Sequence, residues 1–190
     1  MITKERTLTI ADWKAMPHGD GNRYEIIEGE LFVSDWPGLT HQTVLTNLFF
    51  QIACFLKDNP VGTVVHNPPL ILGNFTAVLP DLVFFFNDQE DTIINDDRLT
   101  GPPALVIEIV ESGLANIQRD CDSKFKLYSK YAVPEYFIVY PKNMTVEQYL
   151  RQGDSLTRAH TVRRDDILTS EALPNFSCQV SKIFRQFLKG

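Results

Sequence analysis

The chain has 190 residues, of which 44% are hydrophobic and 22% are charged, and this composition predicts one globular domain over residues 1–190 with a full core. No run of about 18 apolar residues is present, so no membrane span is expected. The formal net charge of −6 argues against a broad basic surface for nucleic acid, although metal ions can supply the cationic contact with phosphate.

The cysteines and the first residues indicate a compartment. Cys54, Cys121 and Cys178 are widely spaced and odd in number, which favours reduced thiols over disulfides. Residues 1–6 are polar and lack the apolar stretch of a signal peptide. Both patterns predict a cytoplasmic protein.

The N-terminal part predicts a short helix followed by a hairpin. Thr9 would cap a helix over residues 9–16, with Asp12 three positions later as its capping-box partner. Residues 23–33 predict two strands around Glu28-Gly29, where the glycine supplies the positive φ of a two-residue turn.

A longer helix is predicted from an N-cap at Thr40 to about Lys57. Its core stripe recurs at helical spacing and comprises Val44, Leu45, Leu48, Ile52 and Phe55. His41 faces the same way as this stripe. A lone histidine there is either a capping or boundary residue or a member of a site, and its position alone leaves both open.

The remaining elements complete an α/β (α+β) core. We expect strands over 62–72, 78–86, 104–110 and 135–140, a polar surface loop over 87–103, a helix over 114–132, and short C-terminal strands over 145–150, 156–162 and 176–180 before a closing helix from Ser181. The central order αβββαβ predicts a mixed sheet, preceded by the helix and hairpin and followed by extra strands. The strand, helix and strand over 104–140 should form a right-handed βαβ unit.

Two acids and a lysine occupy apolar positions in this core. Asp81 follows Pro80 at the head of a strand. Glu108 lies in a strand whose alternate faces are both apolar, which places this strand at the centre of the sheet and encloses the acid. An enclosed acid is costly unless a cation pairs with it or a metal ion binds it.

Lys124 is the candidate partner. At helical spacing it lies at the centre of an apolar face, whereas Lys126 and Lys130 point elsewhere. Asp120 and Tyr128 lie one turn before and after it. Listed by spacing, the apolar neighbours on this face are Ile117, Cys121, Tyr128 and Tyr131.

Two interpretations of these residues remain open. In the first, Asp81 and Glu108 bind Mg²⁺ or Mn²⁺, which prefer carboxylate oxygens, and Lys124 positions a water molecule. In the second, Glu108 and Lys124 form a structural ion pair and Asp81 caps the end of a strand.

The pattern of these residues resembles the PD-(D/E)XK nuclease superfamily and, more closely, the Uma-type restriction endonuclease family. The similarity runs from about Leu8 to Phe184 and is carried by residues 24–31, His41, residues 80–82, residues 106–112, Asp120, Lys124, Tyr128 and residues 133–139. In the superfamily a lysine stands two residues after the strand acid, where this chain has Val110, and in the Uma-type family the lysine comes from the following helix. A second departure is the segment 111–114, where the family usually has a Ser-Pro-Ser/Thr turn.

The resemblance implies a metal-dependent endonuclease with a restriction endonuclease-like fold that acts on DNA. It places the metal ion on Asp81, Glu108 and the carbonyl of Ile109, with Lys124 on the water. Glu25 would reach the metal through water, and His41 would contact the scissile phosphate. The rival hypothesis is a binding module that keeps the fold without turnover. Symmetric cleavage of a duplex favours a homodimer.

Overall fold

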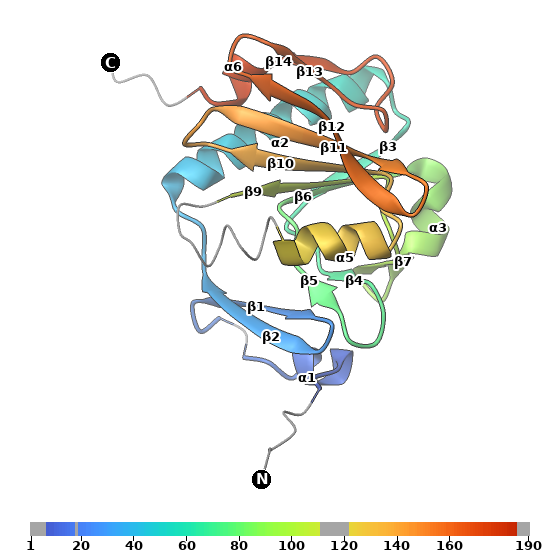
Figure 1. Cartoon of the computed structure of the whole chain (residues 1–190). Coiled ribbons are helices and arrows are strands. Elements are labelled where there is room, and N and C mark those ends of the chain that lie inside the picture. The colour runs from blue at the N-terminus through green and yellow to red at the C-terminus, as the bar shows by residue number, and fades with distance from the viewer. Residues whose placement is uncertain (1–6, 18, 111–121, 186–190) are drawn as a thin grey trace.

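A computed structural model describes residues 7–17, 19–110 and 122–185 (Figure 1). Its strands form two six-stranded sheets and a two-stranded ribbon. The first sheet, sheet A, has the order β2-β1-β5-β4-β8-β7. Its strands are β1 (Asn22–Ile27), β2 (Glu30–Asp35), β4 (Leu70–Ile71), β5 (Ala77–Val78), β7 (Ile94–Asn95) and β8 (Arg98–Thr100).

The second sheet, sheet B, has the order β12-β11-β10-β9-β6-β3. Its strands are β3 (Gly62–His66), β6 (Leu82–Phe86), β9 (Leu105–Ile109), β10 (Glu135–Tyr140), β11 (Thr145–Gln152) and β12 (Ser155–Arg163). Within this sheet β9 and β10 pair in parallel and the other neighbours pair antiparallel. The ribbon consists of β13 (Ile167–Thr169) and β14 (Ser177–Gln179).

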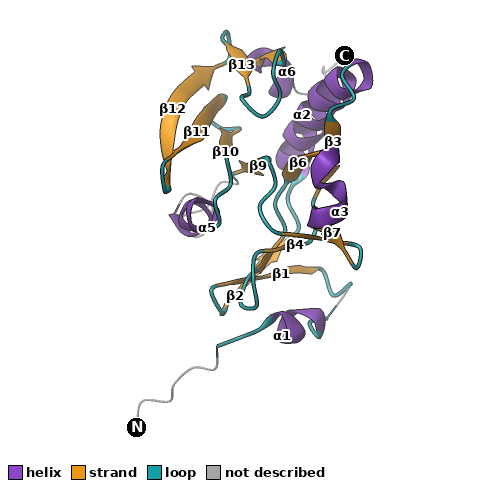
Figure 2. Ribbon diagram, turned by 90° about the vertical axis from the view of Figure 1, so that its right-hand side faces the viewer, coloured by secondary structure: helices purple, strands orange, loops and turns teal. Residues whose placement is uncertain are grey.

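Helices cover both faces of sheet B (Figure 2). The helices are α1 (Ile10–Lys14), α2 (Leu39–Asp58), α3 (Glu90–Ile93), α5 (Lys124–Lys130) and α6 (Val180–Ile183), with a 3-10 turn, η1 (Asn87–Gln89), before α3. Leu105, Ile107 and Ile109 of β9 share a core cluster with α2, while Val106 belongs to a second cluster with Tyr128 of α5. Among the described residues, no helix has the length and hydrophobicity needed to cross a membrane.

The order α2, β3, β6, β9, α5, β10 confirms the expected mixed core and the central place of β9. The predicted hairpin is confirmed by β1 and β2, which pair in register around Glu28 and Gly29. The capping box of α1 is confirmed as well, because the main-chain N–H of Thr9 donates to the Asp12 carboxylate and the N–H of Asp12 donates to the Thr9 hydroxyl.

Two of the predicted strands are wrong in a way that matters for the site. The expected strand over 62–72 divides into β3 in sheet B and β4 in sheet A, and the strand over 78–86 divides into β5 in sheet A and β6 in sheet B. Asn67 has a positive φ of 48°, and prolines lack the N–H that a sheet ladder requires, so both runs break at their prolines. Between residues 62 and 86 the chain therefore passes twice between the sheets, first from sheet B to sheet A and then back.

Three smaller predictions are corrected. The helix α2 begins at Leu39 with Gly38 as its N-cap, so Thr40 lies inside the helix. The segment 87–103 is not a featureless surface loop, because it contains η1, α3, β7 and β8 and buries Ile93 and Leu99 in the core. The strand β13 was not expected; it lies at a short apolar stretch that only its pairing with β14 defines.

Candidate active site

The candidate site lies where the chain crosses between the two sheets. Pro80 stands between β5 and β6, and Asp81 follows it directly. The strand β1 supplies Arg23 and Glu25, which share one face because they are two positions apart. The central strand β9 supplies Glu108.

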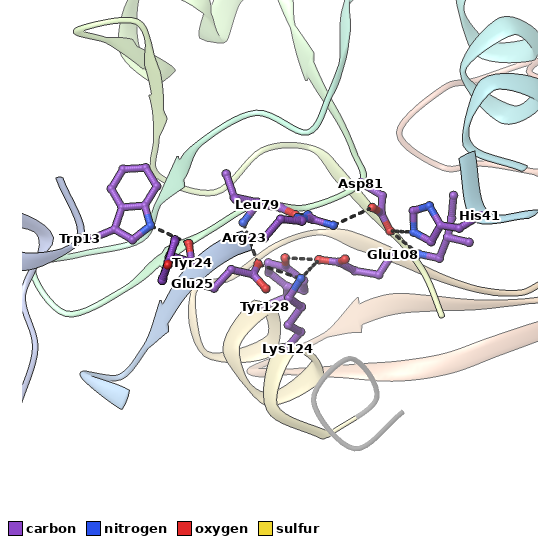
Figure 3. Close-up of polar contacts among 11 residues, drawn as sticks. Trp13, Arg23, Tyr24, Glu25, His41, Leu79, Asp81, Glu108, Lys124 and Tyr128 are labelled. Atoms are coloured by element: carbon purple, nitrogen blue, oxygen red, sulfur yellow. Dashed lines mark hydrogen bonds and ion pairs between the residues drawn. The ribbon is translucent and has the colours of Figure 1, made fainter. Parts of the chain in front are cut away.

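Two helices complete the site from opposite faces of sheet B. The first turn of α2 carries His41, and α5 carries Lys124 and Tyr128 one turn apart. Figure 3 shows these side chains pointing toward one another between the hairpin, the Pro80 segment and α5. All of the charged members are buried, and the most exposed of them, Arg23, keeps 7% of its surface accessible.

Asp81 is held by three groups. His41 Nε2 lies 3.0 Å from Asp81 Oδ2, and the main-chain N–H of Ile109 donates to the same oxygen at 2.7 Å. The Arg23 guanidinium approaches the other oxygen, Oδ1, to 3.9 Å. Burial by itself raises the pKa of Asp81, but the His41 contact, the Arg23 charge and the Ile109 N–H together hold that pKa below its usual value. Asp81 is therefore an ionised carboxylate at neutral pH.

Lys124 bridges two carboxylates. Its Nζ lies 3.0 Å from Glu25 Oε1 and 2.9 Å from Glu108 Oε1. The Tyr128 hydroxyl donates to the same Glu108 oxygen at 2.7 Å. Burial, followed by the Glu108 charge, raises the pKa of Tyr128 well above its ordinary value, so this phenol is a fixed donor. The ammonium and the phenol thus orient Glu108 through one of its two oxygens.

Arg23 is the site residue that the sequence analysis missed. Its guanidinium donates to the Leu79 carbonyl at 2.5 Å, while the Leu79 N–H donates to Glu25 Oε1 at 2.8 Å. The hairpin therefore holds both the carbonyl and the N–H of Leu79, which lies two positions before Asp81. The available signal was the spacing of Arg23 and Glu25, which alternation on a strand places on one face.

The chain matches, over residues 10–181, the family Uma2, whose description is "Putative restriction endonuclease". The chain belongs to the Uma2 family. The resemblance expected from the sequence is thereby confirmed at the level of the family. No curated protein matches the chain.

A solved structure shares the fold of this Uma2 chain. It is described as a "putative nuclease belonging to DUF820 from Anabaena variabilis ATCC 29413" and superposes with a TM-score of 0.72 at 14% sequence identity. The match covers 93% of this chain and 97% of that chain. At this identity the likeness establishes the nuclease-like fold and leaves the chemistry to the residues themselves.

The Uma2 fold brings the predicted side chains together. Asp81, Glu108, Lys124, Glu25 and His41 all lie in the one cluster described above. Lys126 and Lys130 lie at the surface, as their helical positions predicted. Several residues of the predicted pattern lie outside the described part of the chain, namely Ile117, Asp120, Cys121 and the segment 111–114.

The contacts that the ion-pair interpretation predicts are present, but one oxygen of Asp81 is not explained by them. Lys124 pairs with Glu108, and Asp81 accepts the Ile109 N–H as a strand cap would. However, Asp81 Oδ1 is buried and has no hydrogen-bond partner among the described residues. A buried carboxylate oxygen without a donor is costly, and a cation beside it would remove that cost.

The donors near Asp81 Oδ1 suit a hard divalent cation. The Val110 N–H donates to the Val139 carbonyl on β10, so the trans peptide aims the Ile109 carbonyl in the opposite direction, toward Asp81. Mg²⁺ and Mn²⁺ prefer carboxylate and carbonyl oxygens together with water. The described residues contain no cluster of three His, Cys, Asp or Glu side chains suited to a metal. The donors present for such an ion would be the carboxylates of Asp81 and Glu108 and the Ile109 carbonyl, and the unsatisfied Asp81 Oδ1 is the observation that agrees with one.

Proposed function

We propose that this Uma2 protein is a metal-dependent endonuclease of the PD-(D/E)XK type that hydrolyses phosphodiester bonds in DNA. The observation that carries the proposal is the buried Oδ1 of an ionised Asp81, which has no hydrogen-bond partner among the described residues and lies near Glu108 (Figure 3). Membership of a family described as restriction endonucleases supports DNA as the substrate. We place the activity in the cytoplasm, which agrees with the free thiols of Cys54 and Cys178.

Asp81, Glu108 and the Ile109 carbonyl would hold Mg²⁺ or Mn²⁺. When bound, such an ion polarises a phosphoryl oxygen and supports the leaving group. The formal charges of the cluster favour its uptake, because Asp81, Glu108 and Glu25 outnumber Arg23 and Lys124 by one negative charge.

Lys124 would orient the attacking water and exchange protons with it. Glu25 shares the ammonium with Glu108, so it sets the direction of the Lys124 side chain and could accept a hydrogen bond from water on that side. His41 is a positioning residue in this scheme, because its Nε2 is engaged by Asp81 Oδ2. This role differs from the scissile-phosphate contact that the family resemblance implies for His41.

Nicking of supercoiled plasmid tests the proposal, since one cut converts the plasmid to its relaxed form. With Mn²⁺ we expect nicking by the wild type and by Lys126→Met, which removes an exposed lysine from the same helix. Lys124→Met should reduce the rate by about 10²-fold or more, the scale for losing a proton-transfer group. Asp81→Asn, which keeps the shape of the side chain, should reduce it as well.

The binding-module hypothesis predicts a different result. A folded wild type that binds DNA but never nicks it, with any divalent cation, would favour that hypothesis. Equal nicking by Lys124→Met and by the wild type would remove Lys124 from the reaction. Circular dichroism of every variant separates lost chemistry from lost folding.

A further inference from the structure

An exposed tryptophan lies against the buried cluster. Trp36 stands between β2 and α2 and keeps 57% of its surface accessible. The Arg23 guanidinium carbon lies 5.8 Å from the centroid of its ring. One side of the ring therefore faces Arg23, and the exposed remainder of the ring is open to solvent. This contact connects the interior of the candidate site with the surface of the protein.

Arg23 retains unused donor capacity beside this ring. Its Nε is buried and has no hydrogen-bond partner among the described residues. One terminal nitrogen donates to the Leu79 carbonyl, and the other remains 3.9 Å from Asp81 Oδ1, which is beyond hydrogen-bond distance. Guanidinium N–H groups match phosphate oxygens well, so a phosphate beside Asp81 would find a ready donor.

We infer that Arg23 and Trp36 form a nucleotide subsite, in which Arg23 binds a phosphate next to the scissile bond and Trp36 stacks on an unpaired base. The inference rests on the proposed function, because it takes nucleic acid as the substrate. Bases in a duplex are covered on both faces by their neighbours, whereas an unpaired base can stack on an exposed aromatic ring. The preferred substrate is therefore single-stranded or locally unpaired DNA.

The negative net charge of the protein agrees with binding of nucleic acid through a few specific contacts. The net charge of −6 leaves no general attraction for the phosphate backbone. A stacking aromatic adds affinity that does not depend on backbone charge. An arginine that already holds its place through Leu79 loses little conformational freedom when it donates to a phosphate.

Tryptophan fluorescence with a short oligothymidylate tests this inference, with Ca²⁺ replacing Mg²⁺ to suppress cleavage. Trp13 is an internal reference, because it is 9% exposed and its indole N–H donates to the Tyr24 carbonyl. An abasic oligonucleotide of equal length presents the same phosphates without bases. We expect the wild type to bind oligothymidylate at least about fivefold more tightly than the abasic chain, with quenching of the exposed tryptophan.

Substitution at Trp36 separates stacking from phosphate binding. Measured by the fluorescence anisotropy of a labelled oligonucleotide, the affinity of Trp36→Ala for oligothymidylate should fall to the abasic level, and its abasic affinity should be unchanged. Phe50→Ala is the matched control, because Phe50 is an aromatic residue of α2 that is 60% exposed. It should bind both oligonucleotides as the wild type does.

Substitution at Arg23 tests the phosphate contact. Arg23→Lys keeps a positive charge but loses the guanidinium Nε–H, and we expect about tenfold weaker binding of both oligonucleotides alike. A melting curve of this variant verifies that it is folded. Should it fail to fold, the Trp36→Ala comparison still decides the inference.

Several outcomes would overturn the inference. They are equal wild-type affinity for the thymidylate and abasic chains, unchanged discrimination in Trp36→Ala, tighter binding of a fully paired duplex, and no binding of any oligonucleotide. Plasmid nicking is scored separately. Base-dependent binding without nicking would support the subsite and contradict the proposed catalysis. Nicking together with unchanged oligonucleotide binding by Trp36→Ala would support catalysis and contradict the subsite.

Discussion

Replacement of Lys124 by methionine is the perturbation whose cost the structure defines best. The side chain is 1% exposed, and its ammonium lies 3.0 Å and 2.9 Å from carboxylate oxygens of Glu25 and Glu108. Methionine keeps the length of the apolar stem and removes only the charge. Both acids then remain buried without their shared cation, and removal of one partner from a buried ion pair costs about 3–5 kcal/mol.

This cost is large enough to be seen in a simple melting experiment. For a chain of this size, each kcal/mol lowers the melting temperature by about 2–4 °C, so Lys124→Met should melt about 6–20 °C below the wild type. The matched control, Lys126→Met, changes an exposed lysine of the same helix and should stay within about 0.5 kcal/mol of the wild type.

A metal ion and a second substitution sharpen the measurement. Mn²⁺ should raise the melting temperature of Lys124→Met more than that of the wild type, because the ion replaces the positive charge that the variant has lost. Adding Glu25→Gln to Lys124→Met should recover about 1–3 kcal/mol, since one of the stranded carboxylates becomes neutral. If Lys124→Met melted within about 2 °C of Lys126→Met, the buried double ion pair would be refuted.

Three further predictions follow from the same contacts. Asp81→Asn should abolish the rise in melting temperature that Mn²⁺ gives the wild type, and an intact Mn²⁺ effect would exclude Asp81 as a ligand. The variant should also lose less stability than the wild type below about pH 4, because the depressed pKa of Asp81 stabilises the folded state only while that carboxylate is ionised. Tyr128→Phe should be about 1 kcal/mol less stable than the wild type at neutral pH, because it loses the hydrogen bond to Glu108. Above about pH 10 it should lose less stability than the wild type, because the raised pKa of Tyr128 stabilises the folded state only while the phenol is protonated. Parallel curves of unfolding free energy against alkaline pH would contradict this. Light scattering should give the mass of a homodimer, because two-fold dimers are by far the commonest oligomers of soluble proteins, and a monomer at high concentration would exclude it.

Local patterns predicted the parts of the site that lie within one element. Alternation along β9 placed Glu108 on a buried face, and helical spacing placed Lys124 on the buried face of α5. Both rules need only the period of a strand or a helix and the positions of apolar residues. The same rules separated Lys124 from Lys126, which is exposed.

The features of the site that the sequence analysis missed depend on contacts between segments that are far apart in the sequence. The apolar runs on both sides of Pro80 are equally strand-like, and the choice of sheet for each half depends on partners elsewhere in the chain. Burial of Arg23 depends likewise on the hairpin facing the Pro80 segment, which no local pattern encodes. His41 was placed on the correct face of α2, but its partner Asp81 comes from the segment between β5 and β6, which helical spacing cannot identify.

The two bonds between the hairpin and Leu79 have a consequence for dissecting or redesigning the protein. A fragment that began at α2 would retain every strand of sheet B, yet it would lack the guanidinium and the carboxylate that hold the Leu79 main chain. It would also remove Glu25, one of the carboxylates that pair with Lys124. The hairpin must therefore travel with the core in any truncation, chimera or circular permutant, whereas the exposed Gly153 turn between β11 and β12 is a better place for an insertion.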